Sequence, residues 1–112
     1  MSFYINEVEI PTSTYNSYIR QCINKIFKIL PIYEDCEEHK DFKCFISYLE
    51  KLIIMFTGSE ILFNQKEFVD LVSILKGLQV EAENLNQNKI KSLVFHCINM
   101  LDGLKIEITK EE

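Results

Sequence analysis

The sequence contains no tryptophan, three glycines, two prolines and a single arginine among its 112 residues. The glycines Gly58, Gly77 and Gly103 lie far apart, so no glycine-rich loop that could hold phosphate groups is present. An acidic chain with a net charge of −5 and one arginine displaces few phosphate counterions. We therefore expect no nucleotide site, no other cofactor and no direct nucleic-acid binding.

Long apolar runs are also missing. The longest, Leu52 to Phe56, has five residues, whereas a membrane span needs about 20. The N-terminal residues Met1 to Ile10 lack a basic region and carry Glu7 and Glu9, which is not typical of a secretory signal. The sequence thus predicts a cytoplasmic protein that does not interact with membranes.

The residues that are abundant indicate a globular protein. Hydrophobic residues make up 47% and charged residues 26% of the chain, and its length fits one domain with a core of its own. Phe, Tyr, Met, Ile, Asn and Lys account for 51 residues, but Ala, Gly, Arg and Pro for only 7. This bias is expected from AT-rich codons and suggests a low-GC bacterium, or a phage or mobile element within one.

Four segments have apolar residues at the three- and four-residue spacing of an amphipathic helix. Pro31 is expected to end or kink the first helix, and Gly58 is expected to end the second. Asn64 followed by Glu67 matches a capping arrangement for the third. The predicted helices cover roughly residues 13–30, 38–57, 65–83 and 87–103.

Both ends of the chain alternate apolar and polar residues, which is typical of short strands: residues 3–10, and 104–109 at the other terminus. These segments could pair with each other or with the edge of a partner's sheet. The predicted fold is therefore all-α, a four-helix bundle-like single domain with short extended segments at one or both termini.

The stretch YEDCEEHKDFKC, residues 33–44, concentrates carboxylates, two thiols and an imidazole. If it forms the start of the second helix, the positive end of the helix dipole would account for the carboxylates without any function. The alternative is an acidic patch that docks a basic partner surface. The residues of this acidic patch are Glu34, Asp35, Glu37, Glu38 and Asp41.

Cysteine and histidine spacing gives weak candidates for a zinc site. Cys36 and His39 are three residues apart and could share an ion on one helix, with His96 as a further ligand. Cys44 lies eight positions beyond Cys36, about 12 Å along a continuous helix, and could join them only if the helix were broken. His96 and Cys97 point about 100° apart, so only one of them could face a common site. The alternative is that the cysteines are core residues or free thiols.

Catalysis by a cysteine nucleophile is not expected. A thiolate is favoured by nearby positive charge, whereas the carboxylates around Cys36 should raise the pKa of its thiol. We therefore expect a protein that is not an enzyme and has no catalytic residues.

The second predicted helix carries more apolar surface than one face can hold. Besides its core stripe it has a second apolar line, and further apolar residues follow in the next linker and in the fourth helix. Such surplus surface favours contact with a partner. Alternatively, Phe63 is a hydrophobic staple, and the terminal strands cover Tyr48 and Met55. The predicted partner-binding residues are Cys44, Tyr48, Ile54, Met55, Ile61, Phe63 and Phe95.

These observations predict a non-catalytic protein-binding module that acts as a small subunit, adaptor or inhibitor in an intracellular complex. The partner is another protein, and a homo-oligomer is a further option. In size and charge the chain is similar to acidic inhibitors encoded by phages or mobile elements. The alternative functions are a small zinc-binding helical protein that uses Cys and His, and a bacteriocin-immunity-like helical protein, a class to which the chain is similar in length and fold class.

Overall fold

A computed structural model describes residues 2–5, 8–63 and 65–105. It confirms the predicted all-α, bundle-like fold and adds an N-terminal β-hairpin. The elements are β1 (Ser2–Ile5), β2 (Val8–Pro11), α1 (Thr12–Phe27), α2 (Ile29–His39), α3 (Lys43–Phe63), α4 (Lys66–Val80), the 3₁₀ turn η1 (Ala82–Asn84) and α5 (Gln87–Asp102).

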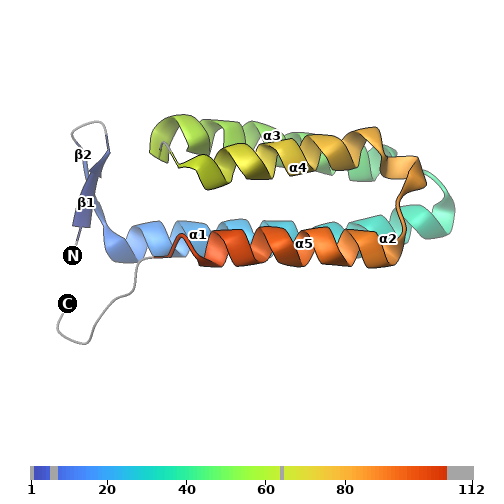
Figure 1. The fold of residues 1–112 in the computed structure, drawn as a ribbon, viewed down its shortest axis with the longest axis horizontal. Helices are drawn as coiled ribbons and strands as arrows, with labels where there is room; N and C mark the ends of the chain where they lie inside the picture. Colours follow the sequence, from blue (N-terminus) through green and yellow to red (C-terminus); the bar gives the residue numbers. More distant parts are fainter. Residues whose placement is uncertain (1, 6–7, 64, 106–112) are drawn as a thin grey trace.

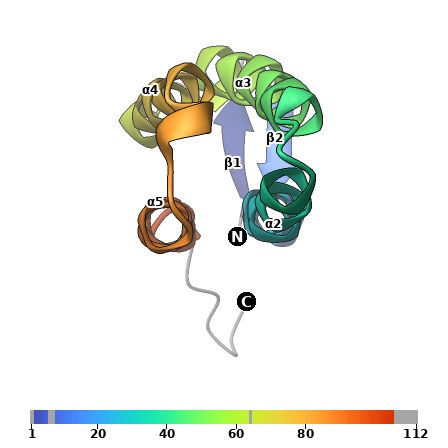
Figure 2. The same cartoon turned by 90° about the vertical axis from the view of Figure 1, so that its right-hand side faces the viewer.

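The helices form two layers of two rods each (Figures 1 and 2). In one layer α1 and α2 follow one another along a single line, and α5 runs beside them. In the other layer α3 and α4 form a helical hairpin. The end-on view in Figure 2 places the four rods at the corners of a quadrilateral, so each rod contacts two neighbours. The predicted four-rod arrangement is present, although the first rod consists of two helices.

The first predicted helix, 13–30, is interrupted at Lys28: α1 ends at Phe27, and α2 starts at Ile29. Pro31 therefore does not end a helix, and the predicted boundary at residue 30 is wrong, but the rod is interrupted three residues before the proline. Pro31 is the third residue of α2, a first-turn position where its missing N–H has no helical acceptor to lose. In a continuous helix Pro31 would face the carbonyl of Phe27, so the break falls just after that residue.

The second predicted helix, 38–57, is shifted toward the C-terminus. Residue 38 belongs to α2, and α3 runs from Lys43 through Gly58 to Phe63. The C-terminal cap with positive φ belongs to Lys40, at the end of α2, and not to Gly58. Gly58 has an ordinary helical conformation, so the expectation that it ends the helix was wrong.

The remaining predicted helices are close to those observed. The third, predicted as 65–83, divides into α4 and the turn η1, and Gln65 stands at the N-cap position. Asn64, proposed as the cap, lies outside the described residues. The fourth, predicted as 87–103, is α5, whose cap is Asn86: its side-chain oxygen accepts the N–H of Lys89 at 2.8 Å.

The N-terminal extended segment is confirmed, but it pairs with itself. β1 and β2 are antiparallel, with Ser2 opposite Pro11 and Ile5 opposite Val8. The hairpin stands at the end of the bundle where α1 begins (Figure 1). The predicted C-terminal extended segment continues into residues 106–109, which lie outside the described part of the chain.

The core lies between the two layers and receives side chains from every helix. Phe56 of α3 stacks on Phe68 of α4, with ring centroids 6.1 Å apart. Across the layers, the buried Tyr33 hydroxyl donates to the backbone oxygen of Leu85 at 2.7 Å, and burial raises the pKa of Tyr33 to about 12. Among the described helices none combines the length and apolar character needed to cross a membrane.

The cap of α2 gives a test of the fold. Lys40 has φ of 54°, and the N–H groups of Lys40 and Asp41 bond to the carbonyls of Glu37 and Cys36, as in a Schellman motif. Because a side chain in this conformation costs about 1 kcal/mol, Lys40→Gly should raise the free energy of unfolding by up to that amount. Urea unfolding followed by circular dichroism measures it.

A matched control is Lys51→Gly, at an exposed position inside α3. There glycine should lower the free energy of unfolding by about 1 kcal/mol, because it weakens a regular helix. A loss of stability in both variants would contradict the assignment of the cap.

Candidate functional site

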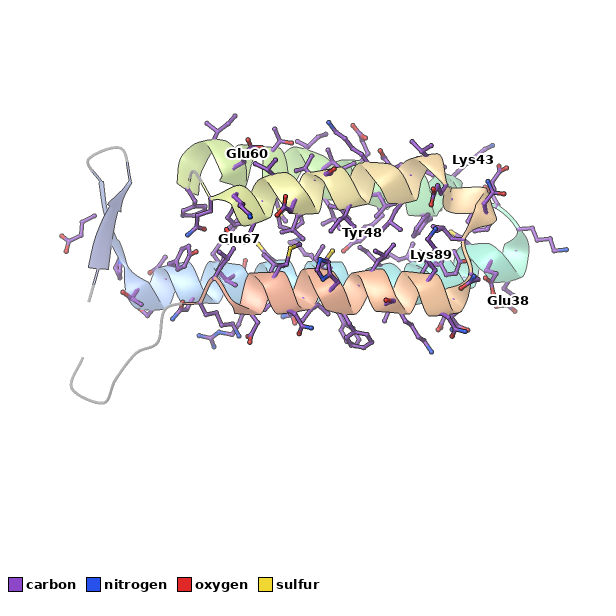
Figure 3. The ribbon with its side chains drawn as sticks, in the orientation of Figure 1. Glu38, Lys43, Tyr48, Glu60, Glu67 and Lys89 are labelled. Carbon is purple, nitrogen blue, oxygen red and sulfur yellow. The ribbon has the colours of Figure 1, made fainter. Side chains whose placement is uncertain are left out.

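Tyr48 and Met55 of α3 face the neighbouring rod formed by α1 and α2. The Tyr48 hydroxyl donates to the backbone oxygen of Lys25 at 2.7 Å, and Figure 3 shows Tyr48 between the layers. Both residues are half-buried and packed against the core. The second apolar line of α3 therefore has an intramolecular role at these two positions, and the terminal strands are not needed to cover it.

Phe63 also packs within the bundle. Its ring lies 5.4 Å from that of Tyr15 and 5.9 Å from that of Phe68, measured between centroids. Phe63, Met55 and Tyr15 line an apolar pocket of about 340 Å³ between α1 and α3. Of the proposed partner-binding residues, Tyr48, Met55 and Phe63 thus contribute mainly to the fold.

Ile54 and Ile61 lie on the opposite side of α3, where they are 66% and 79% exposed. They point about 180° and 160° away from the buried Phe45. Three further exposed side chains join them on the outside of the α3–α4 layer, and one of these, Ile46, was expected from the sequence to belong to the core stripe of its helix. We call this surface the outer face; its residues are Ile46, Ile54, Ile61, Val69 and Val80.

Hydrogen bonds between α3 and α4 fix the position of the outer face. Gln79 donates from Nε2 to the backbone oxygen of Ile46 at 3.1 Å and to the Glu50 carboxylate at 3.0 Å. Gln79 is therefore on the side of α4 that faces α3. Val69 and Val80 lie about 80° and 100° further around the helix, beyond this contact and away from the core. Each of the two helices therefore contributes one row of exposed aliphatic side chains to the outer face.

Phe95 is half-exposed and has a partner in its own chain. Its ring meets that of Phe27 of α1, with centroids 6.3 Å apart and planes at 80°. This edge-to-face pair belongs to the layer of α1, α2 and α5, so Phe95 is not part of the outer face. The sequence indicated Phe95 by its position off the main stripe but did not indicate Phe27.

The acidic patch does not lie at a helix entrance. Glu34, Asp35, Glu37 and Glu38 occupy the second half of α2, and Asp41 follows its cap. All are exposed, and Figure 3 shows Glu38 at the end of the bundle. The C-terminal end of a helix carries partial negative charge, so the dipole opposes these carboxylates. The expectation that a favourable dipole accounts for them was therefore wrong.

The break between α2 and α3 brings Cys44 close to Cys36 and His39. All three line one pocket of about 330 Å³, together with Asp35 and Asp41. The sequence excluded Cys44 only for a continuous helix, and the turn at Lys40 removes that obstacle. Cys36 is buried, whereas Cys44 and His39 are exposed.

His96 lies in a different part of the molecule. It follows Phe95, which contacts Phe27 at the end of α1, whereas His39 is twelve residues beyond Phe27. At 1.5 Å per residue this separates the two histidines by roughly 18 Å along the rod. His96 therefore cannot share an ion with Cys36 and His39.

The buried thiols are poorly suited to nucleophilic chemistry. Burial raises the pKa of Cys22 to about 11 and that of Cys97 to about 12. The pKa of Cys36 is also raised, first by burial and further by Cys44, Asp35 and Asp41. Its thiol accepts a hydrogen bond from the backbone of Phe45, which acts in the opposite direction. At neutral pH these three thiols stay protonated.

Comparison with known protein families, with curated proteins and with solved structures finds no match to this chain. The arrangement of its side chains is thus the basis for a functional proposal. Two features stand out: the aliphatic outer face, and the corner between α2 and α3 with its thiols, imidazole and carboxylates.

The buried thiols predict how stability depends on pH. The pKa of a cysteine in an unfolded chain is about 8.5, so folding raises the pKa of Cys22 and Cys97. The contribution of these two thiols to the free energy of unfolding is complete below about pH 8.5 and is lost as the pH rises toward 11 and 12. Each thiol should lower the free energy of unfolding by at most about 1.4 kcal/mol per pH unit over this range.

Urea unfolding between pH 8 and pH 11, followed by circular dichroism, measures this slope. Cys97→Ala should make it shallower, whereas Cys44→Ala serves as the control because the Cys44 side chain is exposed. Equal slopes in the wild-type protein and in Cys97→Ala would contradict the assignment.

Proposed function

We propose that the protein is a non-catalytic protein-binding module, acting as a small subunit, adaptor or inhibitor, and that the outer face is its contact surface. The observation that carries this proposal is the gathering of five exposed β-branched side chains on two adjacent helices. Ile54, Ile61 and Val80 are each at least 66% exposed. Covering such side chains contributes about 25 cal/mol per Å² of apolar area removed from water.

The outer face is well suited to association because it is already ordered. β-Branched side chains have one strongly preferred rotamer in a helix, so little side-chain entropy is lost on contact. α3 and α4 also pack on each other through stacked rings such as Phe56 and Phe68, which makes the backbone beneath a firm support. Little reorganisation would therefore oppose binding.

The shape of the outer face favours an amphipathic helix as the partner element. Ile46, Ile54 and Ile61 follow one another at spacings of eight and seven residues, about 12 and 10 Å along α3. Val69 and Val80 form a second row on α4. A partner helix lying between the two rows would bury both of them with apolar residues at its own two-turn spacing.

The test is to replace Ile54 and Ile61 by glutamate together. The tagged protein is purified from its native cells, its partner is identified by mass spectrometry, and the purified pair is then studied by calorimetry. Two buried carboxylates facing an apolar helix should weaken binding by about 100-fold or more. Helical content should stay unchanged, because neither residue belongs to the core.

The matched control is the double variant Asn24→Glu and Ser92→Glu, which adds the same charge at exposed positions of the other layer. It should bind as the wild-type protein does. Equal affinity of all three proteins for the partner would overturn the outer face as the contact surface.

A further inference from the structure

Two cysteines meet at the corner between α2 and α3. Cys36 lies in the last turn of α2 and Cys44 in the first turn of α3, and both line one pocket of about 330 Å³. In a continuous helix the eight positions between them would span about 12 Å. The turn at Lys40 reverses the chain and brings the two residues to the same pocket instead.

Aromatic rings beside the two cysteines fix how the helices meet. Tyr33 lies about one turn before Cys36 on the buried side of α2, and Phe45 directly follows Cys44. The rings of Tyr33 and Phe45 are buried, and their centroids are 5.4 Å apart in an edge-to-face arrangement. The end of α2 and the start of α3 therefore pack directly on each other next to the cysteines.

The backbone of α3 places the sulfur of Cys36 beside Cys44. The N–H of Phe45 donates to the Cys36 thiol. In a longer helix this N–H would bond to the carbonyl oxygen of the residue four positions earlier, so the sulfur takes the place of that oxygen. The Cα–Cβ bonds of a helix are tilted toward its N-terminus, and residues three apart share a face, so the Cβ of Cys44 leans toward the same place. Rotation of the Cys44 side chain then brings the two sulfur atoms within reach of each other.

The two thiols differ in their access to solvent. Cys44 is exposed, whereas Cys36 is only 3% exposed. An oxidant from solvent therefore reaches Cys44 first. Burial is the main cause that raises the pKa of Cys36, and the nearby Cys44 raises it further. Cys36 is thus a protonated thiol that reacts with a group held against it by the fold.

The charge of the corner favours a neutral oxidant. Asp35 and Asp41 line the same pocket as the cysteines, and the exposed Glu37 and Glu38 lie in the last turn of α2. These carboxylates repel anionic disulfides such as oxidised glutathione. Hydrogen peroxide is uncharged and small, so neither the carboxylates nor the size of the pocket opposes its approach to Cys44.

We infer that Cys36 and Cys44 form a site of reversible oxidation, at which hydrogen peroxide generates a disulfide between α2 and α3. In the first step the Cys44 thiol becomes a sulfenic acid, and peroxide is reduced to one water. The Cys36 sulfur then attacks the Cys44 sulfur: the S–S bond forms, the S–O bond breaks, and the Cys36 proton leaves with the hydroxyl group as a second water. The disulfide fixes the turn at Lys40, and a thiol reductant restores both cysteines. The outer face takes no part in this chemistry, so the inference does not depend on the proposed function.

The experiment treats the full, folded and reduced chain with dilute hydrogen peroxide. The intact mass should fall by about 2 Da, because two hydrogen atoms are lost. After unfolding in urea, N-ethylmaleimide should label only the thiols of Cys22 and Cys97, whereas it labels all four cysteines of the reduced protein. Trypsin cleaves after lysine, so without reductant it should release peptide 29–40 linked to peptide 44–51. Dithiothreitol should separate the two peptides.

Variants test whether the folded geometry directs the bond. Cys44→Ser should leave the remaining thiols reduced under the same conditions. The matched control combines Cys44→Ser with Ile46→Cys, which keeps an exposed thiol near Cys36 in the sequence but places it on the outer face, about 200° around α3 from position 44. This double variant should form no disulfide within the chain. Circular dichroism checks that each variant is folded.

Three results would overturn the inference. They are four reactive thiols in the wild-type protein after treatment, a covalent dimer through Cys44 as its main product, and a disulfide in the double variant at the wild-type rate. The oxidised protein should also unfold at a higher urea concentration than the reduced protein, since the bond restricts the unfolded chain. A lower urea midpoint would contradict a disulfide that the folded structure accommodates.

Discussion

Each rod of a two-layer bundle contacts two neighbours, and this constraint organises the molecule. α3 contacts its two neighbours through two separate apolar lines. Phe56 on one line stacks on Phe68 of α4, and Tyr48 on the other donates a hydrogen bond to the backbone of α1. Once both contacts are made, the apolar residues that remain on α3 point directly away from the core. Ile54 and Ile61 are exposed for this reason, and not because α3 is apolar on every side.

Two local features determine where α2 begins and ends, and the corner between α2 and α3 follows from them. Pro31 lacks an N–H, so the first rod breaks at Lys28 and α2 starts at Ile29. The acidic residues 34–38 therefore lie in the second half of α2. Lys40 then ends α2 with a left-handed cap. Together they place the carboxylates at the negative end of a helix dipole and set Cys44 against the last turn of α2.

Much of the fold could be predicted from periodicity, because an apolar spacing of three to four residues that continues for about 15 residues matches a helix and no strand. The boundaries at Pro31 and Gly58 could not. A proline is tolerated in a first turn, and a glycine inside a helix is tolerated where packing supports it, so either residue is compatible with two outcomes. In the folded chain each of these positions lies near a contact between residues far apart in the sequence: Tyr33 bonds to Leu85, and Phe63 packs on Tyr15.

The sequence by itself determined the number of rods, most of the core and the position of the reactive groups within residues 33–44. Only the tertiary structure decided which apolar residues of α3 face a neighbouring helix and which face water. It also decided which of the thiol, imidazole and carboxylate groups line the same pocket. The physical reason is that periodicity describes one helix at a time. Burial depends on how separate helices are rotated relative to one another. Whether His39 and Cys44 line the same pocket depends on where the chain reverses between α2 and α3.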